Sequence, residues 1–335
     1  MYNDILKFQH RVDQRSNALA SDMIRELDAA RVEILGKLAD LQDRYIRGDY
    51  NTETFQRKQA FLLHQRNEVE DTLDSVFSNI GDQLQSASED VIAATTVHTI
   101  STMNNSTGLD IQFFHLDPEL VQAWFQTGLI EGSTLTDWLN KLKQSTADRI
   151  IKAQRQSLIQ GESVGGMVKR LRQEGVEGSY RDLTGLARTS MLSAANYARE
   201  QTVTQGFGDV LTGWQYCATL DSRTCLVCGD LDGTTYGPTD QKEDLPLHWC
   251  CRCCYIPLVG GEGANTDDRP AVTDERVERF DGTYNEWMQS QLESDPGFVK
   301  DVLGPGRFDL FKDGKISLSN MVTNGEITTL ADLKG

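Results

Sequence analysis

Apolar residues recur every three or four positions through most of the first hundred residues. The first run is Leu19, Met23, Leu27, Ala30, Ile34, Leu38, Leu41 and Tyr45, and the second is Leu62, Val69, Leu73, Val76, Ile80, Leu84, Ala87 and Val91. This spacing places each run on one face of a helix. Between the runs, at 47–51, the period breaks, and Gly48 is a typical residue just beyond a helix end. The pattern predicts two long helices joined by a short turn, an antiparallel hairpin with coiled-coil packing.

Beyond residue 100 the predicted elements are shorter. Thr134 and Asp137 have the spacing of a capping box, which would begin a helix that extends to about Gln160. Asp182 is a candidate N-cap for a further helix. The apolar stretch 210–220 predicts a strand directly before the cysteines.

The last third of the chain changes character twice. Residues 258–279 are rich in glycine and acidic residues and show no period, which is typical of a linker or an exposed loop. Apolar residues recur again from 280 to 335. We therefore expect an α+β protein that is predominantly α-helical. It would have a long N-terminal helical hairpin or coiled-coil arm (1–100), a central domain of helices and a small sheet (101–257), a linker (258–279) and a short C-terminal α-rich segment (280–335).

Charge narrows the range of functions. The 335 residues include 33 basic and 50 acidic side chains, a net charge of −17. This excess opposes general binding to duplex DNA or to an anionic membrane, since both are negatively charged. A run of about 18 apolar residues, the minimum for a membrane span, does not occur. The first residues also lack the basic and then apolar pattern of a secretory signal.

One stretch departs from the acidic balance. Between positions 141 and 172, only Asp148 and Glu162 oppose eight basic residues, which are Lys141, Lys143, Arg149, Lys152, Arg155, Lys169, Arg170 and Arg172. A solvated helix face is the simplest interpretation of such a run. A docking surface for an acidic partner, or a track for DNA phosphates, is the alternative.

All seven cysteines lie between positions 217 and 254. They are Cys217, Cys225, Cys228, Cys250, Cys251, Cys253 and Cys254, and His248 precedes the second group. An odd number without an export signal argues against a disulfide framework. A Cys-x-x-Cys pair followed about twenty residues later by a second Cys/His group has the spacing of a structural zinc ribbon. Reduced, buried thiols without a metal are the alternative.

The candidate ligands outnumber the four places around a tetrahedral zinc ion. Cys225 and Cys228 form the firm pair, and the remaining candidates for two places are His248, Cys250, Cys251, Cys253 and Cys254. If the second group is a strand, alternation places Cys251 and Cys253 on the same side. The predicted set is therefore Cys225, Cys228, Cys251 and either His248 or Cys253. Cys217 lies in the apolar stretch and is expected to be a small buried hydrophobe.

Two motifs contain most of the cysteines. The first is Trp214-x-x-x-Ala218-Thr219-Leu220-Asp221-Ser222-Arg223-Thr224-Cys225-x-x-Cys228-x-x-Leu231-Asp232-Gly233, and the second is Pro246-Leu247-His248-x-x-Cys251-Arg252-Cys253. Together they resemble the phage Mu F-like minor head proteins, a head morphogenesis family of tailed bacteriophages. The resemblance covers 130–257 well and 285–333 loosely, and leaves the first hundred residues outside. Cys250 and Cys254 depart from the family pattern.

The resemblance implies a minor capsid protein of a phage virion. Such a protein is made in the host cytoplasm, enters the capsid lumen next to the portal, and acts in head morphogenesis and in genome packaging or ejection. The implied partners are the portal protein, the scaffolding or major capsid protein and packaged DNA, without a membrane in the assembled head. The domain at 101–257 would be the Mu F-like domain, and the basic residues at 141–172 the candidate contact with portal or DNA.

Within the motifs, Asp221, Arg223 and Arg252 are expected to have a structural role. An acid–guanidinium bridge or a backbone cap would orient the cysteines. A catalytic site of Asp221, Arg223 and His248 beside the metal is the alternative.

We expect no enzymatic activity. The crowding of sulfur and nitrogen donors favours a closed structural ion over the open position that a metal-dependent hydrolase or nuclease needs. A toxin built on the same module would need a catalytic domain after the linker, where only 280–335 remain.

Overall fold

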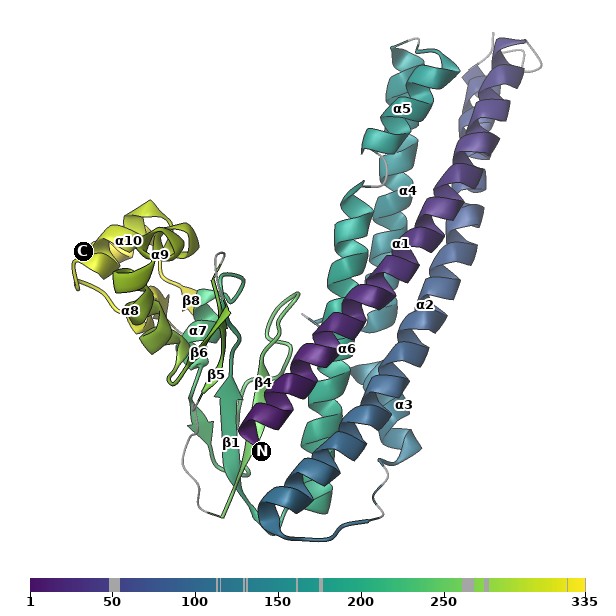
Figure 1. Cartoon of the computed structure of the whole chain (residues 1–335). Helices are drawn as coiled ribbons and strands as arrows, with labels where there is room; N and C mark the ends of the chain where they lie inside the picture. Colours follow the sequence, from purple (N-terminus) through teal and green to yellow (C-terminus); the bar gives the residue numbers. More distant parts are fainter. Residues whose placement is uncertain are drawn as a thin grey trace. The chain divides into compact units, whose positions relative to one another are not determined.

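The computed structural model describes residues 1–47, 55–112, 114, 116–128, 130, 132–160, 162–174, 177–260, 268–273, 277–323 and 325–334. Helices dominate these residues and the sheets are small (Figure 1), which confirms the expected α+β, predominantly helical class. The predicted turn at Gly48 lies outside the described residues. None of the described helices is long and apolar enough to cross a membrane.

The elements follow one another along the chain. The helices are α1 (Tyr2–Ile46), α2 (Phe55–Thr107), α3 (Pro118–Thr127), α4 (Leu135–Ile159), α5 (Val164–Glu174), α6 (Glu177–Gly206), α7 (Leu226–Leu231), α8 (Tyr284–Ser294), α9 (Pro296–Leu303), α10 (Pro305–Lys312) and α11 (Leu330–Lys334). The strands are β1 (Leu211–Cys217), β2 (Leu220–Asp221), β3 (Thr235–Tyr236), β4 (Cys254–Val259), β5 (Arg269–Val272), β6 (Val277–Phe280), β7 (Val322–Thr323) and β8 (Glu326–Ile327).

The chain forms two compact units. The bundle unit consists of Gln14–Asp90 and Glu119–Met191, and the sheet unit of Met1–Asp13, Val91–Pro118 and Leu192–Gly335. Each unit therefore combines segments that are far apart in the sequence, and α1, α2 and α6 each contribute residues to both units.

In the bundle unit, four helices are linked in a closed ring, in the order α1, α2, α4, α6. The linking contacts are Arg15 with Asp90 (2.6 Å), Asp74 with Lys143 (2.6 Å), Arg149 with Asp182 (2.8 Å) and Arg188 with Asn17 (2.7 Å). This closed ring is the arrangement of a four-helix bundle.

Helices α1 and α2 run antiparallel within the bundle unit. Arg15, early in α1, pairs with Asp90, whereas Lys37, later in α1, donates to the Thr72 hydroxyl at 3.0 Å. The apolar residues of the two runs explain how α1 and α2 pack in the bundle unit, because most of those that lie in this unit are buried. Those buried are Met23, Leu27, Ala30, Ile34, Leu38, Leu41, Val69, Leu73, Val76, Ile80 and Leu84. The two long helices that the period predicts are therefore present and antiparallel.

The predicted helix starts have mixed outcomes. The Thr134 N–H donates to Asp137 Oδ2 (3.1 Å) and the Asp137 N–H donates to Thr134 Oγ1 (3.2 Å), so the capping box is confirmed. The predicted cap at Asp182 is wrong, since α6 already begins at Glu177. Asp182 instead pairs with Arg149 of α4, because a carboxylate one turn into a helix can serve a neighbouring cation as readily as the helix end.

The sheet unit is built on an antiparallel sheet of order β3-β1-β4. Tyr216 lies opposite Tyr255, and Cys217 lies opposite Cys254. Since side chains alternate between faces, these two pairs occupy opposite faces of the sheet. The tyrosine face packs on the ends of α2 and α6 and on the cysteine cluster, whereas the Cys217–Cys254 face packs on Tyr2 at the start of α1.

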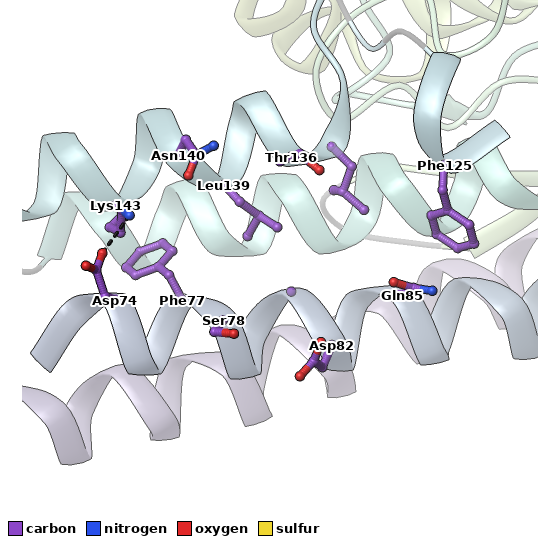
Figure 2. A pocket seen from close by; sticks show the side chains of 12 residues that line it. Asp74, Phe77, Ser78, Asp82, Gln85, Phe125, Thr136, Leu139, Asn140 and Lys143 are labelled. Carbon is purple, nitrogen blue, oxygen red and sulfur yellow. Dashed lines mark hydrogen bonds and ion pairs between the residues drawn. The ribbon is translucent and has the colours of Figure 1, made fainter. Parts of the chain in front are cut away.

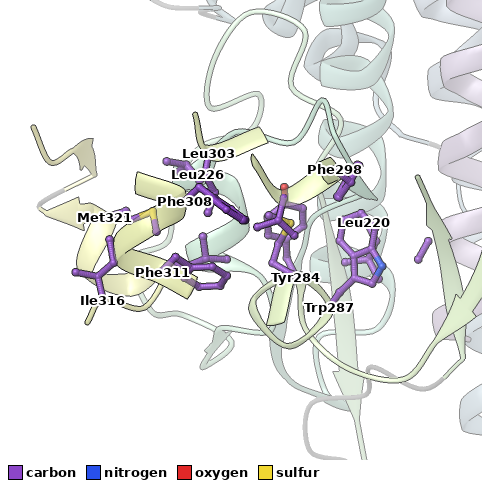
Figure 3. Packing of buried hydrophobic residues seen from close by; sticks show 14 residues of the cluster. Leu220, Leu226, Tyr284, Trp287, Phe298, Leu303, Phe308, Phe311, Ile316 and Met321 are labelled. Atoms are coloured by element: carbon purple, nitrogen blue, oxygen red, sulfur yellow. The ribbon is translucent and has the colours of Figure 1, made fainter. Parts of the chain in front are cut away.

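A second sheet joins the C-terminal helices to this unit. β2 runs parallel to β5, and β5 runs antiparallel to β6. The core around it (Figure 3) combines Leu220 and Leu226 with the buried aromatic side chains Tyr284, Trp287, Phe298, Phe308 and Phe311. Gly229 in α7 allows this packing, because a Cβ there would lie 2.4 Å from the Tyr284 ring.

The expectation that 258–279 is a linker is wrong for much of the segment. β5 occupies Arg269–Val272, β6 begins at Val277, and Arg269 is one of the largest fully buried side chains. The sequence of this segment indicated a loop for two reasons. The strands are too short to show a period, and Arg269 is a charged residue, which sequence patterns treat as exposed although it is buried here.

A buried ion pair fixes the junction between the two sheets. Arg269 donates to both carboxylate oxygens of Asp232, and their side chains are 2% and 1% exposed. Asp232 also accepts from the backbone N–H groups of Ala218 (2.7 Å) and Tyr284 (2.6 Å). Arg269 donates in addition to the carbonyl oxygens of Ala218 (3.2 Å) and Gly282 (3.1 Å). One carboxylate thus connects the end of β1, strand β5 and the start of α8.

We expect Asp232→Asn to destabilise the sheet unit strongly. Removing one partner of a buried pair leaves an uncompensated charge on Arg269 and should lower the free energy of unfolding by about 3–5 kcal/mol. Urea unfolding followed by tryptophan fluorescence measures this loss. Asp268→Asn is the matched control, because Asp268 pairs with Arg279 on the surface and solvent screens such pairs. Equal midpoints for the two variants would contradict the prediction.

Candidate functional site

The first pair of cysteines is positioned by the start of a short helix. Cys225 is the N-cap residue of α7, and its sulfur accepts a hydrogen bond from the Cys228 N–H at 3.4 Å. The turn of the helix brings both sulfur atoms to the same side, which is the arrangement of a metal-binding knuckle.

The second group lies on a turn. The Cys251 N–H donates to the His248 carbonyl oxygen (3.0 Å), and Cys250 between them has a left-handed backbone (φ 63°). The condition of a strand at 250–254 is therefore not met for most of the segment, since β4 begins only at Cys254. A hydrogen-bond contact of 2.9 Å between His248 Nδ1 and the Trp249 carbonyl oxygen orients the ring, so that Nε2 faces the first pair of cysteines.

The two groups meet at one cluster. His248 Nε2 lies 3.3 Å from Cys225 Sγ and 3.2 Å from Cys228 Sγ, and Cys228 Sγ lies 4.0 Å from Cys251 Sγ. Two sets of three donors could each hold a metal ion: Cys225, Cys228 and His248, and Cys228, Cys251 and Cys253. Cys228 belongs to both sets. All five predicted ligands are therefore brought together.

The other three cysteines lie outside these two sets. Cys250 is half-buried on the turn, and Cys217 and Cys254 face Tyr2 on the opposite side of the sheet. Cys217 is buried as expected in a hydrophobic cluster with Ile5 and Ile256, but its sulfur also has polar contacts. Its sulfur lies 3.4 Å from the Tyr2 hydroxyl and 3.3 Å from Arg269 Nη1.

The hydrogen bonds of the cluster shift the pKa values of its members in different directions. The hydrogen bond with Cys228, helped by the one with His248, lowers the pKa of Cys225 to about 4. The hydrogen bond with Cys225 raises the pKa of His248 to about 9. The pKa of the Cys228 thiol is raised by its hydrogen bonds with Cys225 and Cys251. Zinc binds thiolates and neutral imidazole, so an entering cation would displace the protons that these groups share.

The donor set fits zinc. Thiolate sulfur and imidazole nitrogen are the ligands of structural zinc sites, and four of the five donors would fill a tetrahedral shell. Three of the five donors, Cys228, Cys251 and Cys253, are less than 5% exposed, and Cys225 and His248 are half-buried. Metal binding would convert these buried thiols to thiolates. The bound ion would then hold the sulfur atoms in a fixed geometry, which free thiols lack.

A carboxylate clamps the residue between the last two ligands. Asp221 Oδ2 and Oδ1 accept from both terminal nitrogens of Arg252 at 2.5 and 2.6 Å, and both side chains are about nine-tenths buried. Arg223 joins more weakly, with a side chain that is 61% exposed and 3.2 Å from Asp221 Oδ2. Burial raises the pKa of Asp221, but the hydrogen bond and charge of Arg252 outweigh it and lower this pKa overall. The clamp thereby orients the Cys251–Cys253 segment.

The basic residues of 141–172 are placed on α4 and α5 of the bundle unit. Four of them contact nearby side chains: Lys141 with Ser133 (2.6 Å), Lys143 with Asp74 (2.6 Å), Arg149 with Asp182 (2.8 Å), and Arg170 with Glu162. Lys152, Arg155 and Lys169 are exposed, and no ion pair in the described part of the chain involves them. The side chain of Arg172 lies outside the described residues.

Lys143 also borders a groove in the bundle unit. Figure 2 shows Lys143 of α4 and Asp74 of α2 facing each other at one end of the groove, with Phe77 and Leu139 beside them and Phe125 toward the other end. The groove has a volume of about 510 Å³. The pairing of Lys143 with Asp74 makes this lysine part of the bundle's packing. Among the described basic residues of 141–172, Lys152, Arg155 and Lys169 are exposed without an ion pair, and Lys141 is exposed but donates to Ser133.

A comparison with known proteins agrees with the sequence motifs. Residues 148–256 match the model of the family described as Phage Mu protein F like protein. The matched segment contains the whole Cys/His cluster together with Asp221 and Arg252. This match confirms the resemblance and supports a part in bacteriophage head morphogenesis and virion assembly. No curated protein and no solved structure matches the chain.

Sequence reasoning missed three residues of the site's support. Arg269 gave no signal, because it stands in a segment without period. Asp232 stood inside the first motif, and its place directly before Gly233 could have marked it as a structural carboxylate. Tyr216 stood in the predicted strand two positions before Ala218, and alternation along that strand could have placed it on the same face as Trp214.

We expect Cys228→Ser to abolish tight zinc binding, because Cys228 belongs to both sets of donors. Zinc bound per chain after dialysis, measured by inductively coupled plasma mass spectrometry, should fall from about one to near zero. Cys250→Ser is the matched control and should keep its zinc, since Cys250 lies outside both sets. Retention of zinc by Cys228→Ser, or its loss in Cys250→Ser, would show that the ligands are assigned wrongly.

Proposed function

We propose that this chain is a minor head protein of a tailed phage whose Mu F-like region is held together by a structural zinc ion. The observation that carries the proposal is the match over residues 148–256, which ends just beyond the last candidate metal ligand. The candidate metal ligands all lie within the segment that matches the family model. The matched segment is therefore the part of the chain that the ion would stabilise. The ligands are four of Cys225, Cys228, His248, Cys251 and Cys253.

The proposed role is structural and not catalytic. Five donors compete for four positions, so a bound zinc ion keeps a closed shell and has no open place for water or substrate. Asp221 is engaged by Arg252 through both oxygens, which suits a clamp better than a general base. The zinc would lock the turn at His248 and Cys251 onto α7.

The proposed location is the capsid lumen next to the portal. The net charge of −17 limits unspecific binding to packaged DNA. Against this background, Lys152, Arg155 and Lys169 form an exposed basic surface on α4 and α5, suited to an acidic face of the portal protein or to DNA phosphates. Scaffolding or major capsid protein are further partners at assembly. Through this position the chain would take part in genome packaging or ejection.

Co-expression with the portal protein of the same phage tests the proposal. Native mass spectrometry of the purified portal ring should show this chain bound at a fixed stoichiometry. A bare ring, together with a free monomer of this chain, would overturn portal docking.

Charge reversal tests which surface docks. We expect the triple variant Lys152→Glu, Arg155→Glu and Lys169→Glu to lose portal binding, since an attractive surface becomes a repulsive one. The control reverses Lys300, Lys312 and Lys315, which are exposed in the sheet unit. Each triple changes the net charge by the same six units, so a difference in copies bound per ring reports position and not total charge. Equal binding of both variants would contradict the assignment of the basic surface.

A further inference from the structure

Tyr216 is a fully buried tyrosine on the sheet face that packs on the metal cluster. Its side chain is 0% exposed. Its backbone is fixed on both sides, because its N–H donates to the Thr234 carbonyl oxygen (2.8 Å) and its carbonyl oxygen accepts from the Gly233 N–H (2.9 Å). Its ring meets Tyr255 edge-on, with 5.6 Å between the centroids. The position of the side chain is thus set by the fold and not by its own hydroxyl.

The Tyr216 hydroxyl has no hydrogen bond of normal geometry to any residue that the structure describes. Leaving a buried hydroxyl unpaired is unfavourable, because the group loses its hydrogen bonds with water. The Tyr216 side chain packs in the same buried cluster as Cys228, Cys251 and Cys253. The unpaired donor therefore lies beside the cysteine cluster.

A neutral thiol is a weak hydrogen-bond acceptor, but a metal-bound thiolate keeps negative charge and lone pairs and accepts well. Outer donors of this kind fix the orientation of metal ligands and tune their donation to the metal. We propose that the Tyr216 hydroxyl donates a hydrogen bond to a metal-bound thiolate of the cluster, with Cys228, common to both donor sets, as the acceptor. Tyr216 is then a positioning residue of the metal centre.

This inference rests on the metal centre of the proposed function. It predicts that loss of the Tyr216 hydroxyl has different effects on stability in the zinc-loaded and the metal-free protein. With metal bound, removing the hydroxyl removes a hydrogen bond to a charged sulfur. Without metal, it removes a buried group that has no adequate partner, and this change is neutral or stabilising. A merely structural tyrosine would affect both states alike.

Tyr216→Phe tests the proposal, with Tyr255→Phe as the matched control. Tyr255 stands opposite Tyr216 on the neighbouring strand, but its hydroxyl donates to the Glu243 carbonyl oxygen (2.8 Å), away from the sulfurs. Zinc affinity is measured by competition with a chelator. Cobalt(II) is substituted for zinc, because the absorption band for charge transfer from sulfur to the metal can then be measured. Urea unfolding is recorded with and without zinc.

We expect Tyr216→Phe to lower zinc affinity about 10–100-fold and to shift the cobalt charge-transfer band to lower energy, because a thiolate without its hydrogen bond donates more strongly. The metal-free variant should unfold at the same or a higher urea concentration than the metal-free parent. Tyr255→Phe should leave zinc affinity and the band unchanged.

Three results would overturn the inference. They are equal zinc affinity of Tyr216→Phe and the parent, an unshifted cobalt band, and a metal-free Tyr216→Phe that is unfolded or as destabilised as its zinc-loaded form. If the parent chain itself takes up no zinc, the metal centre of the proposed function fails as well. If the parent binds zinc and Tyr216→Phe binds it equally, only the role of Tyr216 fails.

Discussion

The pairing of Arg269 with Asp232 is the interaction on which the sheet unit depends. Asp232 follows α7 directly, so the carboxylate that holds β5 and α8 is only four residues from the metal-ligand candidate Cys228. Both charges are buried, and each is stable only because the other is present and because backbone groups satisfy their remaining hydrogen-bonding capacity. Any shift of β5 would therefore be transmitted through Asp232 to the helix that carries the first pair of cysteines.

The sheet separates two kinds of cysteine chemistry. On one face, Cys228 and its neighbours form the cluster beside Tyr216, where a cation can replace shared protons. On the other face, Cys217 meets the Tyr2 hydroxyl and the Arg269 guanidinium, which already supply its polar contacts. Strand alternation contributes to this division, because Tyr216 and Cys217 are adjacent in β1 and point to opposite faces of the sheet. Six of the seven closely spaced thiols are in this way divided between two environments.

Sequence patterns predicted the long helices well and the support of the site poorly. The period of α1 and α2 reports burial directly, so Met23 or Leu73 could be assigned to the core from spacing alone. The cysteine motif likewise predicted the cluster, because metal-ligand spacing is local. Arg269 could not be found, since its partner Asp232 is 37 residues away and short strands such as β5 carry no period. Strand alternation does not describe Cys250 and Cys251, because Cys250 adopts a left-handed backbone and the segment forms a turn.

The contact between Tyr2 and Cys217 spans 215 positions of the sequence. During synthesis the first turn of α1 leaves the ribosome long before β1 and β4 are made. Its apolar side chains therefore stay unpacked until these strands have formed. Such non-local pairing slows folding and leaves surface exposed to aggregation in the meantime. The first turn of α1 is thus an element that docks late, after β1 and β4 have formed.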